Sequence, residues 1–116
     1  MALFAWYAPA MPRARVKLSN TNETELVPAR SGESIEVLGY EVAEGDGDGD
    51  GDVAFASEAV GDGDGDEVYN VSLGANTTVV YPAAPSALFE TAASQRLTVT
   101  GRATTAITCT YRYVVR

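Results

Sequence analysis

Histidine is absent from the 116-residue sequence, and cysteine occurs once, at Cys109. Without histidine, the Ser-His-Asp and Cys-His forms of nucleophilic catalysis lack their general base. A single cysteine rules out an internal disulfide, and the missing histidine also removes the usual zinc sites. We therefore expect a protein that is not an enzyme, with Cys109 as a small buried hydrophobic residue.

Long hydrophobic runs are also lacking. Residues 1–8 are apolar, but no basic segment precedes them and Pro9 and Pro12 follow closely. A membrane-spanning helix needs about 20 apolar residues, and a secretory signal begins with a positively charged segment. We expect neither a membrane span nor a signal peptide.

Basic residues are scarce, since 8 of them face 16 acidic residues and Lys17 is the single lysine. Eleven of the acidic residues lie between residues 41 and 67, where no basic residue occurs. The net charge of −8 argues against binding to nucleic acid, because the phosphate backbone is also negatively charged. The scarcity of lysine, together with the use of Asp, Ala and Val, is compatible with a salt-loving host.

Glycine and aspartate alternate in residues 45–52 and again in residues 61–66. In an extended chain such carboxylates point to one side, about 6 to 7 Å apart, and repel one another. Salt or a bound cation would relieve this repulsion, because hard ions such as Ca²⁺ take about six to eight oxygen ligands. The repeats are therefore either solvated loops or sites for Ca²⁺, Mg²⁺ or other cations. The candidate ligands are Asp46, Asp48, Asp50, Asp52, Asp62, Asp64 and Asp66.

The EF-hand pattern does not explain the first repeat, because Ser57 stands where that loop needs a bidentate glutamate. The two repeats also flank one apolar segment, residues 53–60. Consecutive loops lie at opposite ends of a strand, so we expect the repeats to meet only across subunits.

Short apolar segments with period-2 alternation occupy the rest of the chain. They predict strands at residues 13–18, 24–28, 33–43, 53–60, 68–73, 77–81, 96–100 and 106–115. The inward register switches at Val37 and Leu38, beside Gly39, which indicates a β-bulge. Residues 91–95 are compatible with one helical turn.

About eight short strands with regular turn signals predict an all-β fold. We expect a single antiparallel β-sandwich of jelly-roll-like topology over residues 13–116, preceded by an extended N-terminal arm at residues 1–12. The arm presents Phe4, Trp6 and Tyr7, which either pack on the same domain or dock on a partner. Arg13, Arg15 and Lys17 alternate with apolar residues and predict a basic outer face for partner contacts.

The order of these elements resembles that of small β-sandwich virion proteins of tailed viruses, which decorate capsids or form the bases of turrets and fibres. The resemblance is carried by residues 35–40 (IEVLGY), 53–57 (VAFAS), 81–82 (YP), 88–91 (LFET), 97–100 (LTVT) and Tyr111. In such proteins a short turn follows the Leu-Gly-Tyr strand, whereas here the first acidic repeat follows it.

This resemblance implies a virion structural protein without enzymatic activity, located on the capsid surface after assembly in the host cytoplasm. Its partners would be the major capsid protein and copies of itself, with a homotrimer favoured, and the virus would be one that infects a haloarchaeon. The alternative is a calcium-dependent binding module, for example for carbohydrate.

Overall fold

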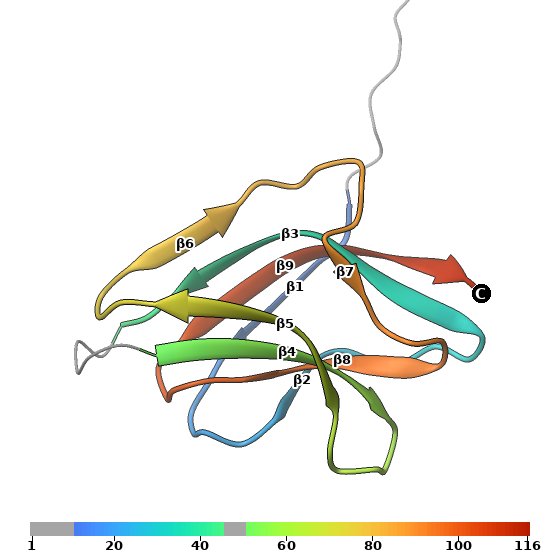
Figure 1. Cartoon of the computed structure of the whole chain (residues 1–116), viewed down its shortest axis with the longest axis horizontal. Coiled ribbons are helices and arrows are strands. Elements are labelled where there is room, and N and C mark those ends of the chain that lie inside the picture. The colour runs from blue at the N-terminus through green and yellow to red at the C-terminus, as the bar shows by residue number, and fades with distance from the viewer. Residues whose placement is uncertain (1–10, 46–50) are drawn as a thin grey trace, which may run out of the picture.

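A computed structural model describes residues 11–45 and 51–116 (Figure 1). Within these ranges the chain forms nine strands and no helix. The strands are β1 (Arg13–Lys17), β2 (Thr24–Val27), β3 (Glu33–Ala43), β4 (Gly51–Ala59), β5 (Asp66–Leu73), β6 (Thr78–Tyr81), β7 (Phe89–Glu90), β8 (Gln95–Thr100) and β9 (Ala106–Val115).

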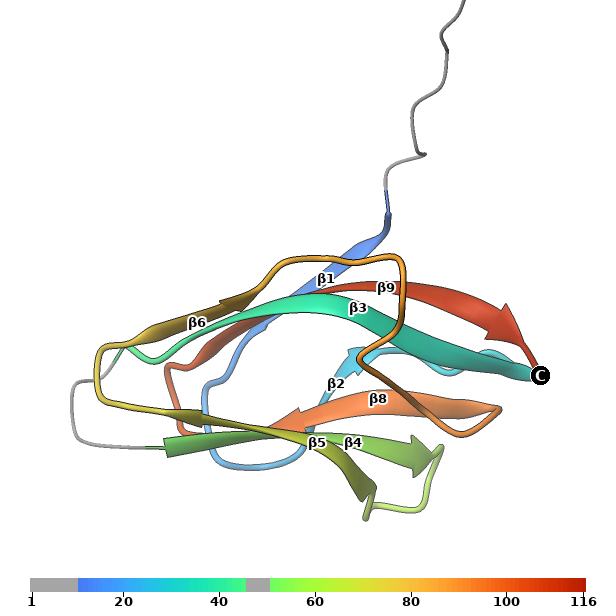
Figure 2. The same ribbon diagram turned by 45° about the horizontal axis from the view of Figure 1, so that its top comes forward.

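The strands form two antiparallel sheets that pack face to face (Figure 2). The first sheet has the order β1-β9-β3-β6, with β7 also paired to β3, and the second has the order β2-β8-β4-β5. Successive strands repeatedly cross from one sheet to the other, and the resulting order is that of a jelly roll. The predicted antiparallel sandwich of jelly-roll-like topology is confirmed.

The core lies between the two sheets and is filled by alternate residues of facing strands. Phe55 of β4 is completely buried and contacts the rings of Tyr40, Tyr69 and Phe89, with centroids 5.1–6.3 Å apart. Cys109 is buried as predicted, and this burial raises the pKa of its thiol to about 12. The thiol therefore stays protonated and acts as a packing group.

The predicted β-bulge in β3 is confirmed. Val37 pairs with Tyr111 and Gly39 with Thr110, so Leu38 is the extra residue. Residues 82–88 run along the edge of β3 at this point, where the Ala84 amide donates to the Leu38 carbonyl at 3.2 Å. A Cβ on Gly39 would lie 2.6 Å from the backbone nitrogen of Ala83, so only glycine permits this close approach.

The suggested helical turn at residues 91–95 is wrong. The Thr91 amide donates to the carbonyl of Ile35, and the Thr91 hydroxyl accepts a bond from the Ile35 amide, so both groups bind β3. The two preceding residues form the short strand β7, which the sequence pattern did not predict. These bonds hold Thr91 extended beside β3. Residues 92–95 then form a single β-turn, in which the Gln95 amide donates to the Ala92 carbonyl at 3.3 Å and Ser94 has a φ of 64°, which is not helical.

The acidic repeats lie at opposite ends of β4, as the strand pattern predicted. Gly51 and Asp52, which end the first repeat, begin β4, whereas residues 61–66 follow its other end (Figure 1). The candidate ligands Asp46, Asp48 and Asp50 lie outside the described residues. So do the arm residues Phe4, Trp6 and Tyr7.

Candidate functional site

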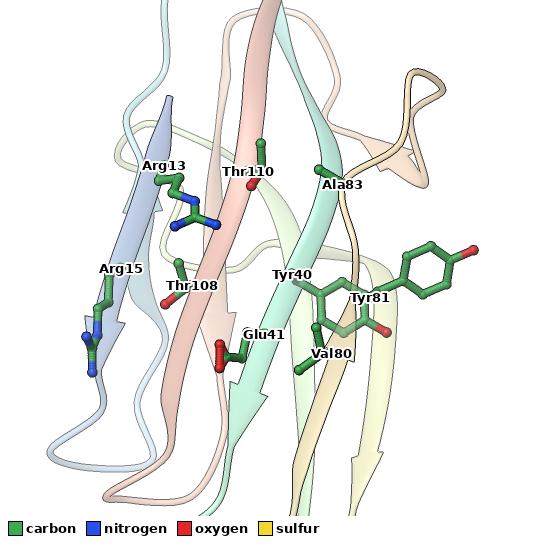
Figure 3. A pocket seen from close by; sticks show the side chains of 9 residues that line it. All are labelled: Arg13, Arg15, Tyr40, Glu41, Val80, Tyr81, Ala83, Thr108 and Thr110. Atoms are coloured by element: carbon green, nitrogen blue, oxygen red, sulfur yellow. The ribbon is translucent and has the colours of Figure 1, made fainter. Parts of the chain in front are cut away.

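A shallow trough follows β9 on the outer face of the first sheet (Figure 3). Its main cavity of about 440 Å³ continues into a smaller one of about 110 Å³. It runs along three cross-strand rows from β1, β9 and β3: Arg13, Thr110 and Gly39; Arg15, Thr108 and Glu41; and Lys17, Ala106 and Ala43. Small side chains in the middle of each row make the floor, and Arg13 and Arg15 of β1 form one wall. Lys17 continues their row beyond this wall.

The basic side chains of β1 have no anionic partner within the described residues. Arg13, Arg15 and Lys17, here called the basic row, are exposed, while Ala14 and Val16 between them pack against the core. Arg96, Arg112 and Arg116, by contrast, make ion pairs with glutamates. The predicted basic outer face is therefore present, and its charge is available to a partner.

The backbone of β1 is also available on one side. Within the two described ranges β1 pairs with β9 alone, so its other edge has no neighbouring strand. Such an edge presents amide and carbonyl groups on which another chain can pair.

The far wall of the trough is apolar and aromatic. Val80 and Tyr81 of β6 are 58% and 44% exposed. The ring of Tyr81 stacks on Tyr40 at 5.8 Å, on the side of the cavity away from Arg13 (Figure 3). Burial raises the pKa of Tyr40 to about 12, so its hydroxyl stays neutral. The trough thus has charge on one wall only, apart from Glu41.

The second acidic repeat, residues 61–66, does not form an extended row of carboxylates. Gly61 and Gly63 have φ angles of 87° and 76°, and the Asp62 amide donates to the carbonyl of Ala59 in a turn. A Cβ at either glycine would meet no atom within 4 Å, so the tip of this acidic hairpin is open, whereas a Cβ at Gly65 would lie 2.9 Å from Glu23. Asp62, Asp64 and Asp66 are all exposed to solvent.

The described residues do not assemble the predicted cation site. They contain no group of three or more acidic, histidine or cysteine side chains placed to hold a metal ion. Asp52 lies at the start of β4, a strand length of roughly 26 to 30 Å from the acidic hairpin. A cation site within one subunit therefore cannot combine Asp52 with the ligands of the second repeat.

A pair of glutamates, the half-buried Glu23 and the buried Glu58, lies on the outer side of the second sheet and was not predicted. Glu58 is 1% exposed, and one of its oxygens accepts a bond from Arg96 Nε at 2.5 Å. Its other oxygen, Oε2, has no hydrogen-bond partner among the described residues. Glu23 accepts a bond from the Thr98 hydroxyl at 2.9 Å. Glu25 is the third carboxylate there and also pairs with Arg96.

The two carboxyl groups affect each other's ionisation. A hydrogen bond with Glu58, followed by burial, raises the pKa of Glu23. The same hydrogen bond, together with the effect of Arg96 and against that of burial, lowers the pKa of Glu58. Two neighbouring carboxylates cannot both ionise cheaply, so Glu23 keeps its proton to higher pH than an isolated carboxyl group does. Glu23 precedes β2 and Glu58 lies on β4, so the registers of β2 against β8 and of β8 against β4 bring them together.

No helix in the described ranges is long and apolar enough to cross a lipid bilayer. No protein-family model matches the chain, and neither a curated protein nor a solved structure matches it.

Proposed function

We propose that the chain is a structural protein of a virus particle, which decorates the capsid or forms the base of a turret or fibre. It would sit on the capsid surface after assembly in the host cytoplasm, bound to the major capsid protein and helping to stabilise the shell. The host would be a salt-loving organism.

The basic row carries this proposal. Outside residues 41–67 the chain has five acidic and eight basic residues, so a mildly basic body bears a strongly acidic region. On that body Arg13, Arg15 and Lys17 form one exposed row without ion pairs in the described residues. Such a row suits attachment to an acidic protein surface, because complementary charge speeds and orients association.

The jelly-roll fold supports the proposal by analogy. Jelly rolls build many viral shell proteins, although the same fold also serves lectins and other domains. The fold alone is therefore weaker support for this function than the basic row is.

Copies of the chain would assemble with one another, and a trimer is the favoured state. The tip of the acidic hairpin is open, and its carboxylates would face solvent or bind cations at subunit contacts. Light scattering of the isolated chain across a salt series, with and without divalent ions, is expected to show a trimer. A monomer under all conditions would contradict self-assembly.

Mass spectrometry of purified virions tests the function itself. We expect peptides of this chain in particles of the virus that encodes it, at a constant ratio to the major capsid protein. Washing the particles in low salt separates bound copies from contaminants. Absence of the chain from intact, washed particles would sink the proposal.

A calcium-dependent binding module, for example for carbohydrate, is the second candidate, favoured by the three exposed aspartates of the acidic hairpin. Titration calorimetry with Ca²⁺ at low salt would then show saturable binding with a fixed stoichiometry. Weak, unsaturable heats would exclude this module.

A further inference from the structure

We infer that β1 binds an extended acidic segment of the shell protein, which pairs as a strand with the free edge of β1. Carboxylates on alternate residues of this segment would face Arg13, Arg15 and Lys17. The inference rests on the proposed function, because it names the partner chemistry of the same surface.

The free edge of β1 has the geometry for strand addition. The strand is held in extended form by its pairing with β9, from Arg13 opposite Thr110 to Lys17 opposite Ala106. Its second edge has no strand partner in the part of the chain that the structure describes. Strand addition gains affinity from main-chain hydrogen bonds and specificity from alternate side chains.

The side chains of β1 determine what the added strand must look like. Directly opposed residues of neighbouring antiparallel strands have Cβ atoms about 4.5 to 5.5 Å apart, and opposite charges there are stabilising. Since the basic row occupies every second position, the partner needs acidic residues with the same period. Ala14 and Val16 are half-buried against the core, so the alternate partner residues should be apolar.

The same charges exclude a symmetric contact between two copies through β1. Pairing two such edges would bring the basic rows together, and like charges directly opposed are destabilising. Charged residues on edge strands commonly prevent such pairing. The basic row therefore selects against a second β1 and in favour of an acidic strand.

The backbone bonds on either side of β1 show which of its groups face the free edge. The Pro12 carbonyl accepts a bond from the Tyr111 amide at 3.1 Å, and both backbone groups of Leu18 bond to residues 104 and 105, so residues 12 and 18 bond toward the β9 side. Because backbone groups alternate between the two edges of a strand, those of Arg13, Arg15 and Lys17 face the free edge. The partner segment should thus span the five residues of β1 and carry three acidic residues.

A peptide of alternating glutamate and valine provides the probe, and a peptide of alternating lysine and valine is its matched control. Fluorescence anisotropy at low salt is expected to show binding of the acidic peptide at least tenfold tighter than that of the basic peptide. Hydrogen exchange should slow at amides of β1 and remain unchanged in β5, the edge strand of the other sheet.

Charge reversal supplies the second arm. The triple variant R13E/R15E/K17E should lose the acidic peptide and gain the basic one, which also shows that the variant is folded. Equal binding of both peptides, no binding at millimolar concentration, or an unchanged exchange rate in β1 would overturn the inference. Presence of the chain in virions would still support the proposed function in that case, so the two failures are distinguishable.

Discussion

At the scale of single residues, the Glu23–Glu58 pair makes folding depend on pH. Glu23 binds its proton more tightly in the folded chain than in the unfolded chain, because its pKa is raised by the hydrogen bond with Glu58 and by burial. The contribution of Glu23 to the free energy of unfolding is therefore complete below the ordinary carboxyl pKa, and it is lost as the pH rises through the raised pKa of Glu23. Glu58 has a lowered pKa, so its contribution is lost only in stronger acid.

We expect the variant E23Q to remove this dependence. Its neutral amide can still donate to Glu58 Oε2 and accept from the Thr98 hydroxyl. At about pH 8 its melting temperature should exceed that of the natural chain by roughly 4 °C, and at about pH 5 the two should agree closely. Thermal unfolding followed by circular dichroism over this range measures the difference.

The matched control is E67Q, which removes an equal charge from an exposed position on the adjacent strand β5. It should shift the melting temperature little and similarly at both pH values. If the melting temperatures of E23Q and of the natural chain changed with pH in parallel, this would contradict the raised pKa of Glu23.

Sequence reasoning located Cys109 in the core but missed this pair, for a physical reason. Alternation within one strand shows which face a residue occupies, and Cys109 follows the alternation of its strand. The alternation within β4 places Glu58 on the outer face with Ala54 and Ala56. It does not indicate that Glu23 would lie beside it. Their contact depends on long-range register, which no local pattern encodes.

At the scale of elements, β3 organises the first sheet, because it pairs with β9, β6 and β7. Residues 82–88 connect β6 to β7 and lie against this strand at its bulge. The Gly39 variant G39A should be destabilised by about 2 kcal/mol or more, because the added methyl group would lie against backbone atoms of Tyr81 and Ala83. Urea unfolding measures this loss.

Gly45 offers the control for that measurement. A Cβ there meets only the Thr104 carbonyl, at 3.8 Å, which is ordinary contact. G45A should therefore retain nearly the stability of the natural chain. Equal stability of both variants would show that residues 82–88 can shift away from residue 39 at little cost in free energy.

Patterns along the strands predicted most of the fold but not its shortest element. The register switch at Val37 and Leu38 predicted the bulge, because a bulge changes which face is apolar. Strand β7 has two residues, too few for any alternation, and it exists because its backbone bonds to β3. The basic row was predicted by its period, whereas its lack of ion pairs within the described residues could be found only from the positions of the carboxylates in the folded chain.

At the scale of the whole molecule, exposed like charges oppose folding. Asp62, Asp64 and Asp66 repel one another and the nearby Glu67, and salt screens this repulsion, with a Debye length of about 10 Å at 0.1 M and 3 Å at 1 M. We expect the melting temperature to rise with NaCl. The variant D62N/D64N/D66N should start a few degrees higher at low salt and rise less.

The choice of ion separates screening from specific binding. Sodium and potassium chloride should act alike, and millimolar CaCl₂ should have a small effect at equal ionic strength. A large rise with millimolar Ca²⁺ that the asparagine variant lacks would instead establish an ion site in the acidic hairpin.

The central place of β9 in its sheet has a consequence for synthesis. Both β1 and β3 pair with β9, so neither can form this pairing until β9 has been synthesised. Contacts between such distant segments close slowly, and unpaired strand edges stay exposed during the delay. The basic row keeps the waiting β1 soluble, because three like charges discourage its pairing with β1 of another nascent chain.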